Sequence, residues 1–144
     1  MTVRKLLGSK GNFVPFVRPD STIADVVEIL EVDDAGALVV TRDERTIEGI
    51  ITEKDVVRAL RMHGPTVMKK SVSEIMTQDV ITCEFGQPIT SILKLMDEHQ
   101  VHHVPIIENG ELCGIINMLD LVKYRLDQIE FEAQSLKEYV AGRA

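Results

Sequence analysis

Two places in the sequence put a polar side chain three residues before an aspartate, directly after a Gly-Ile-Ile run. Thr52 precedes Asp55 in the first place, and Asn117 precedes Asp120 in the second. Thr-x-x-Asp is a capping box, in which side chain and backbone exchange hydrogen bonds at a helix N-terminus, and Asn-x-x-Asp is close to one. From this spacing alone, helix capping and a role in binding both remain open.

Histidine and cysteine side chains offer a second kind of chemistry. His99, His102 and His103 lie close together in the sequence, and Cys83 or Cys113 could add a further zinc ligand. No Cys-x-x-Cys pair accompanies them, and the helix carrying His99 is expected to end before His102. We therefore expect no metal site, and we expect both cysteines to be small buried hydrophobic residues.

Motifs for catalysis are missing from the sequence. There is no Gly-x-Ser-x-Gly, Walker loop, His-Glu-x-x-His or dinucleotide-binding fingerprint. We expect a protein that is not an enzyme and that needs no catalytic cofactor.

The composition is that of a globular chain of 144 residues, of which 44% are hydrophobic and 27% charged. A net charge of −7 argues against a nucleic-acid binder or a membrane-surface protein, because both need a basic face. No run approaches the roughly 18 apolar residues of a membrane span. Arg4 and Lys5 are not followed by the apolar segment of a signal peptide. We therefore expect a cytoplasmic protein that binds neither nucleic acid nor membrane.

An internal repeat organises the chain. The two Gly-Ile-Ile runs, residues 49–51 and 114–116, lie 65 residues apart, and Asp55 and Asp120 keep that spacing. Earlier in each half, apolar positions align at a spacing of 66: Ile23, Val26, Val27 and Leu30 with Ile89, Ile92, Leu93 and Met96. The period is too long for a helical solenoid and fits two copies of one small unit of helices and strands.

Each copy is predicted to fold as β-α-β-β-α. Amphipathic helices are expected to begin near Ser21 and Gly86, and a second helix follows the last strand of each copy. Asn109-Gly110 is typical of a two-residue hairpin turn. The strands are predicted at residues 13–17, 37–41, 47–52, 80–83, 103–107 and 112–117. The predicted units are a first repeat (8–63), a linker (64–72), a second repeat (73–126) and a C-terminal helical extension (127–144).

The last predicted helix runs from about Leu119 to Val140 and passes the end of the repeat. Its apolar residues recur alternately three and four positions apart, as in a coiled coil: Leu119, Val122, Leu126, Ile129, Ala133, Leu136 and Val140. Its outer part should not hold as an isolated helix in water, so either the body of the chain or another copy must cover it. We expect a homodimer.

The doubled motif resembles a tandem pair of CBS domains, the module named after cystathionine β-synthase; a tandem pair is also called a Bateman module. Residues 101–106 (Val-His-His-Val-Pro-Ile) resemble the segment entering the middle strand of the second repeat, and 73–77 (Ser-Glu-Ile-Met-Thr) its usual lead-in. The resemblance covers about residues 3–126, so the chain looks like a stand-alone CBS-pair protein. It implies a mixed α/β (α+β) fold of two pseudo-symmetric repeats packed together, with an extended C-terminal helix.

In the CBS family the cleft between the repeats binds adenosine-containing ligands such as AMP, ATP, NAD or S-adenosylmethionine. By motif match, the resemblance implies that Asp55 and Asp120 contact ribose and that Thr52 and Asn117 contact sugar or phosphate. A carboxylate can accept two hydrogen bonds from the ribose diol, and a helix N-terminus favours phosphate.

Positive charge for a phosphate should come from a different set of residues. His102 and His103 occupy the position where AMP-activated kinase regulatory subunits place basic residues on the phosphates. The first repeat has no such pair, so Lys54 or Arg58 (or Arg18) would have to serve there. Ser or Thr is usual where this chain has Asn117, so we rank the first site above the second.

The sequence therefore predicts a regulatory, non-catalytic module that senses energy or redox state by binding an adenosine nucleotide and that acts as a dimer on a protein target it does not identify. The alternative is a structural scaffold with an empty cleft, whose C-terminal helix pair binds a partner protein.

Overall fold

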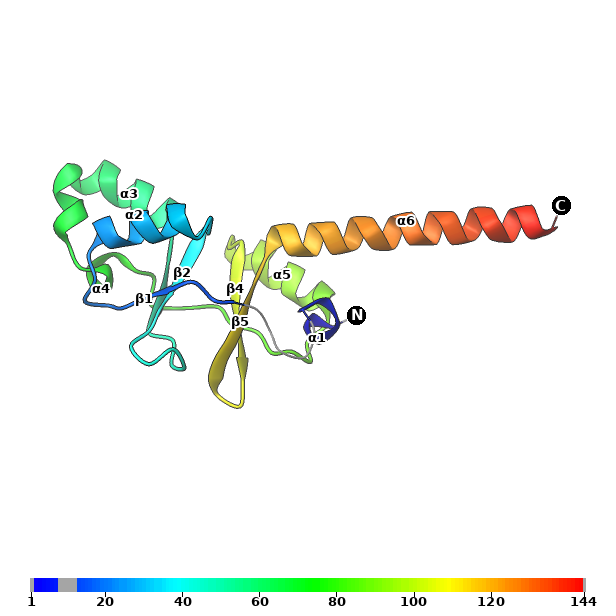
Figure 1. Cartoon of the computed structure of the whole chain (residues 1–144), viewed down its shortest axis with the longest axis horizontal. Coiled ribbons are helices and arrows are strands. Elements are labelled where there is room, and N and C mark those ends of the chain that lie inside the picture. Colours follow the sequence, from blue (N-terminus) through cyan, green and yellow to red (C-terminus); the bar gives the residue numbers. More distant parts are fainter. Residues whose placement is uncertain (1, 8–12, 144) are drawn as a thin grey trace.

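The computed structural model describes residues 2–7 and 13–143. Two halves of similar design lie side by side (Figure 1), and each contains two helices and a pair of antiparallel strands at the expected places. The first half comprises β1 (Phe16–Val17), α2 (Ile23–Val32), β2 (Ala37–Val40), β3 (Gly49–Thr52) and α3 (Glu53–His63). The second half comprises α5 (Ile89–His99), β4 (His103–Glu108), β5 (Glu111–Asn117) and α6 (Met118–Arg143). The predicted mixed α/β fold with a long C-terminal helix is confirmed, although residues 8–12 of the predicted first repeat lie outside the described residues.

Hydrogen bonding joins β1, β2 and β3 into one sheet, in which β1 is parallel and β3 antiparallel to β2. The second half pairs β4 with β5 through the expected turn, where Asn109 and Gly110 both have positive φ. The predicted strand over 80–83 is wrong: it is reduced to a single parallel bridge between Cys83 and Ile106. At this bridge the Cys83 N–H donates to the Pro105 carbonyl (3.0 Å), and the Cys83 carbonyl accepts from the Ile107 N–H (2.8 Å).

Capping groups explain where the helices begin. Thr22 caps α2 and Thr52 caps α3, each exchanging hydrogen bonds with the aspartate three residues later. Helix α5 follows Pro88 and ends at Gln100, whose left-handed backbone (φ 54°) turns the chain away before His102. The predicted starts near Ser21 and Gly86 are therefore two and three residues early, close to the usual uncertainty of helix ends.

Each half has its own aliphatic core, and both cores use residues from outside the predicted repeats. The predicted linker folds as a 3₁₀ turn (Pro65–Lys69) and the start of α4 (Val72–Ile75), and it buries Val67 and Val72 in the first core. The N-terminal helix α1 (Val3–Leu7) lies against the second half, where Val3 is fully buried (Figure 1).

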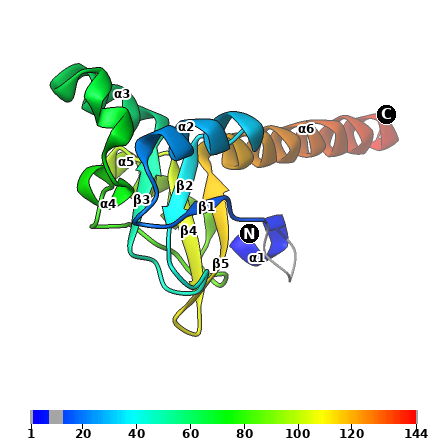
Figure 2. The same cartoon turned by 60° about the vertical axis from the view of Figure 1, so that its left-hand side comes forward.

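Helix α6 projects from the body as a single rod (Figures 1 and 2). It has 26 residues and exceeds the predicted helix by a few residues at its C-terminal end. Leu121 is buried in the second core, whereas every side chain from Ile129 to Gly142 is exposed. None of the helices in the described residues is both long and apolar enough to cross a membrane.

Candidate functional site

Asp55 lies at the N-terminus of α3 and is held there by Thr52. Its Oδ2 accepts hydrogen bonds from the Thr52 backbone N–H (3.0 Å) and the Thr52 hydroxyl (3.1 Å), while the Asp55 N–H donates to that hydroxyl. The other oxygen, Oδ1, is 3.8 Å from the Arg58 guanidinium, and 13% of the Asp55 side chain is exposed. Capping therefore engages Oδ2, whereas Oδ1 faces the Arg58 guanidinium.

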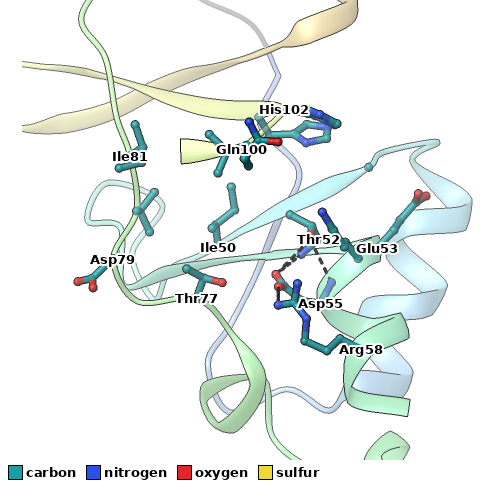
Figure 3. A pocket seen from close by; sticks show the side chains of 15 residues that line it. Ile50, Thr52, Glu53, Asp55, Arg58, Thr77, Asp79, Ile81, Gln100 and His102 are labelled. Atoms are coloured by element: carbon teal, nitrogen blue, oxygen red, sulfur yellow. Dashed lines mark hydrogen bonds and ion pairs between the residues drawn. The ribbon is translucent and has the colours of Figure 1, made fainter. Parts of the chain in front are cut away.

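A cavity of about 330 Å³ opens beside this carboxylate, between the two halves (Figure 3). The first half contributes β3 and the first two turns of α3, and the second half contributes the connection from α5 into β4. Its lining includes the predicted site residues Thr52, Lys54, Asp55, Arg58, His102 and His103. The structure thus brings together six predicted residues from two segments that lie far apart in the chain.

The segment after α4 forms the opposite wall of the cavity with Thr77, Asp79, Val80 and Ile81 (Figure 3). Thr77 is fixed there because its backbone N–H and C=O both bond to Ile50, each at 2.9 Å. Ile50, Ile81 and Val101 make parts of the lining apolar, as a flat ring would require.

Gly49, the first residue of the first motif, allows this close approach. A Cβ built on Gly49 would lie 2.6 Å from the Met76 Sδ and 2.9 Å from the Thr77 carbonyl oxygen. Real Cβ atoms essentially never approach other atoms so closely. The glycine of the motif is therefore needed for packing against residues 76–77, and through them for the cavity wall.

Charges of both signs line the cavity. Lys54 and Arg58 are basic, whereas Glu53, Asp55 and Asp79 are acidic. Arg18, the alternative cation considered from the sequence, instead donates to the Arg42 carbonyl and pairs with Asp20.

His103 lies where the two halves meet. Its Nε2 is so close to Gly36 that a Cβ there would stand 2.9 Å away. Burial and the neighbouring His102 lower the pKa of His103, while the carboxylates of Glu53 and Asp120 act in the opposite direction. His103 thus borders the Asp55 cavity and also feels the charge of the second motif's aspartate.

The second motif forms the same cap as the first. Asn117 N–H donates to Asp120 (3.2 Å), and Asp120 N–H donates to the Asn117 side-chain oxygen (2.9 Å). Neither residue is part of the lining of the 330 Å³ cavity. The structure therefore separates the eight predicted residues into six at one cavity and two at the start of α6.

No metal centre is seen in the described part of the chain, where His, Cys, Asp and Glu side chains form no group of three that could hold an ion. Cys83 is buried and Cys113 half-buried, and neither forms a disulfide. Burial raises the pKa of the Cys83 thiol to about 12, so it remains protonated and unreactive at neutral pH.

Sequence reasoning missed the wall formed by Thr77, Asp79 and Ile81, together with Gln100 and Gly36. The available signal was residues 73–77, which were identified only as the lead-in to the second repeat. The hydrogen bonds between Thr77 and Ile50 connect segments that no local pattern relates.

Two similar repeats with a cavity between them, each with a capping aspartate after a Gly-Ile-Ile strand, define a tandem-repeat architecture. The family model for the CBS domain matches residues 12–62 and 72–127. The chain therefore belongs to the CBS domain family and contains a tandem pair of these domains.

Relatives and solved structures agree with this assignment. The chain is 34% identical over 127 residues to an uncharacterized 17.7 kDa protein of Acidianus ambivalens, covering 88% of this chain and 76% of that one. It is 27% identical over 149 residues to the mitochondrial CBS domain-containing protein CBSX3 of Arabidopsis thaliana, covering 98% of this chain and 72% of that one. The CBS-domain protein ATU1752 of Agrobacterium tumefaciens superposes with a TM-score of 0.83 at 37% identity, over 87% of this chain and 99% of that one.

A more distant structure shows the same fold with ligands. The CBS domain pair of protein MJ0100, solved with 5′-methylthioadenosine and S-adenosyl-L-methionine, superposes with a TM-score of 0.77 at 22% identity, over 89% of this chain and 98% of that one.

Proposed function

We propose that this chain is a regulatory, non-catalytic module that senses energy or redox state by binding an adenosine-containing ligand in the cavity beside Asp55. The observation that carries the proposal is a carboxylate at the edge of a 330 Å³ cavity between the repeats, with one oxygen held by the helix cap and the other facing Arg58. AMP, ATP, NAD and S-adenosylmethionine are the ligands of this class.

Each part of such a ligand has a complementary group in the cavity. Asp55 Oδ1 can accept hydrogen bonds from a ribose diol, and Ile50 and Ile81 can contact the faces of a purine. Lys54, Arg58 and the α3 N-terminus supply positive charge for a phosphate or carboxylate. The MJ0100 complex supports the class of ligand, because adenosyl compounds occupy a CBS pair of this same fold.

Thermal unfolding with millimolar AMP, ADP, ATP, NAD or S-adenosylmethionine tests the proposal. At a hundredfold excess over Kd, a ligand that binds only the folded state adds about 2.7 kcal/mol. For a chain of this size the melting temperature should rise by several degrees, on the order of 5–10 °C. Asp55→Ala should lose most of that rise. A flat response of the wild type to all five compounds would contradict the proposal.

Asp25→Ala is the matched control, because Asp25 caps α2 through Thr22 with nearly the same distances (3.0 and 3.2 Å) and does not line the cavity. Both substitutions remove a capping carboxylate and should cost about 1 kcal/mol of stability. Only Asp55→Ala should also remove the ligand response. Equal responses in the two variants would show that Asp55 serves the helix alone.

Asp120→Ala tests the ranking of the two motifs. We propose that Asn117 and Asp120 form the weaker site, so this variant should retain most of the response. A larger loss than in Asp55→Ala would reverse the ranking.

A structural scaffold is the second candidate, and the exposed apolar residues of α6 favour it. A scaffold with an empty cleft would show no stabilisation by any of the five compounds. Mass spectrometry of small molecules released from the purified, denatured protein distinguishes the two functions independently of any choice of ligand.

A further inference from the structure

Helix α6 exposes a continuous apolar seam that the body of the chain leaves uncovered. Leu126, Ile129, Leu136 and Val140 are exposed by 55, 47, 63 and 60%, respectively. At the base of the helix, Leu119 and Val122 are also exposed, by 58 and 43%. A projecting helix without tertiary contacts is marginal in water, so its stability requires a partner along this seam.

The seam fits a heptad repeat without interruption. Spacings of three and four alternate along it, which fixes Leu119, Leu126, Ala133 and Val140 at heptad position a and Val122, Ile129 and Leu136 at position d. The occupant of such a seam is another helix with the same heptad pattern, and a second copy of α6 provides one.

Charges beside the seam select the orientation of the two helices. Lys123, Glu130 and Lys137 occupy position e, whereas Arg125 and Glu132 occupy position g. In a parallel, in-register pair each g residue lies beside the e residue five positions further along the partner helix. Arg125 then lies beside Glu130 of the second copy, and Glu132 lies beside Lys137 of the second copy. Both contacts are attractive, and the two-fold symmetry forms each of them twice.

The antiparallel arrangement with full overlap gives the opposite result. There, e positions meet e positions and g positions meet g positions, so Lys123 lies beside Lys137 of the other copy. Glu130 and Glu132 each meet their own equivalents. All three contacts bring like charges together, which disfavours this arrangement.

We propose that α6 pairs with α6 of a second copy of this chain as a parallel, in-register coiled coil. In the single chain, Arg125 donates to Gln128 of its own helix (2.8 Å) at an exposed position, from which its side chain can turn to Glu130 of the second copy. The residues at positions a and d include types found in two-stranded coiled coils and types found in coiled coils of more helices. The proposal therefore specifies how neighbouring helices pair, and the mass in solution gives the number of helices. The pairing does not depend on a ligand in the cavity.

Sedimentation equilibrium of the full chain tests the association. The wild type should have at least twice the monomer mass at tens of micromolar, and Ile129→Asp with Leu136→Asp should lower this mass. Phe131→Asp is the control, because Phe131 is 74% exposed but lies at position f, opposite the seam. It should associate like the wild type. Circular dichroism verifies that the body remains folded in every variant, since none of the three residues is buried.

A charge exchange tests orientation and register. Arg125→Glu alone places the new glutamate beside Glu130 of the second copy. It should weaken association about tenfold, because an exposed ion pair that forms twice can account for a change of this size. Adding Glu130→Arg restores opposite charges in the parallel, in-register pair, so the double variant should associate like the wild type. In an antiparallel pair, the arginine introduced at position 130 instead lies beside an e residue of the other copy. Depending on the register, that residue is the same introduced arginine, Lys123 or Lys137, and each of these contacts brings like charges together.

Each result decides the proposal. Association that needs the seam and recovers in the double variant supports it. A monomeric wild type, association unaffected by the two aspartates, or a double variant that associates more weakly than Arg125→Glu would overturn it. The wild-type pairing should also weaken as salt is raised, because the flanking charges are exposed.

Discussion

His103 lies at the junction of the two repeats, and charged groups of both repeats influence its pKa. It contacts Gly36 of the first repeat, and Glu53 and Asp120 influence its charge from the starts of α3 and α6. Because burial and His102 lower its pKa, the folded protein binds a proton at His103 less readily than the unfolded chain does. A ligand that changes the charge near Glu53 would therefore also change the surroundings of His103.

Stability should consequently fall as the solution becomes acidic through the ordinary histidine range. The pKa of His103 is below 6.5 in the folded protein, so the unfolded state takes up more protons below that pH and is favoured. The contribution of one such group is at most about 1.4 kcal/mol per pH unit. Chemical denaturation between pH 7 and pH 5 should show a shallower dependence for His103→Gln than for the wild type, and identical slopes would contradict this role.

Asp43 provides a separate window at lower pH. The backbone N–H groups of Thr46 and Arg45 hold the pKa of Asp43 at about 2, against 3.8 for the free group. The contribution of Asp43 to folding stability is therefore complete above pH 3.8 and is lost as the pH falls from 3.8 to about 2. It does not interfere with the His103 measurement, which is made between pH 7 and pH 5.

At the scale of elements, the junction between β3 and residues 76–77 holds the cavity together. Gly49→Ala should force Met76 and the Thr77 carbonyl away, because the new Cβ would lie at 2.6 and 2.9 Å from them. Overpacking of this kind costs about 1–3 kcal/mol, and the displaced wall should also weaken ligand binding.

Gly86→Ala is the control for this prediction, because nothing lies within 4 Å of a Cβ at Gly86. Urea unfolding should show a clear loss of stability for Gly49→Ala and little change for Gly86→Ala. Equal stability of the two variants would show that residues 76–77 adjust without consequence.

The described part of the molecule consists of two CBS repeats and a projecting helix, and the family model accounts for most of the chain. We therefore expect prolonged incubation with ATP or NAD to leave the nucleotide intact by chromatography. Turnover that survives repurification and disappears in Asp55→Ala would contradict a purely regulatory role.

Ligand binding and self-association of the chain should be separable, because the seam of α6 and the cavity share no residue.

Local patterns in the sequence determined most of the fold. Apolar periodicity identified α2, α5 and α6, because a helix that buries one face repeats that face every three to four residues. The doubled Gly-Ile-Ile-x-x-x-Asp motif identified the two repeats, and the seam of α6 could be read directly as a heptad pattern. The strand predicted at residues 80–83 was wrong because its partner is chosen by long-range contacts, which the local β-propensity does not contain.

Only the tertiary structure decided which motif borders a cavity. Both aspartates form the same kind of cap, so the local capping pattern does not show which of them borders the 330 Å³ cavity. The difference comes from distant segments: Thr77 bonds to Ile50, and His103 packs against Gly36 across the junction of the repeats. These contacts depend on how two separately formed cores are set against each other, and no spacing along the chain encodes that arrangement.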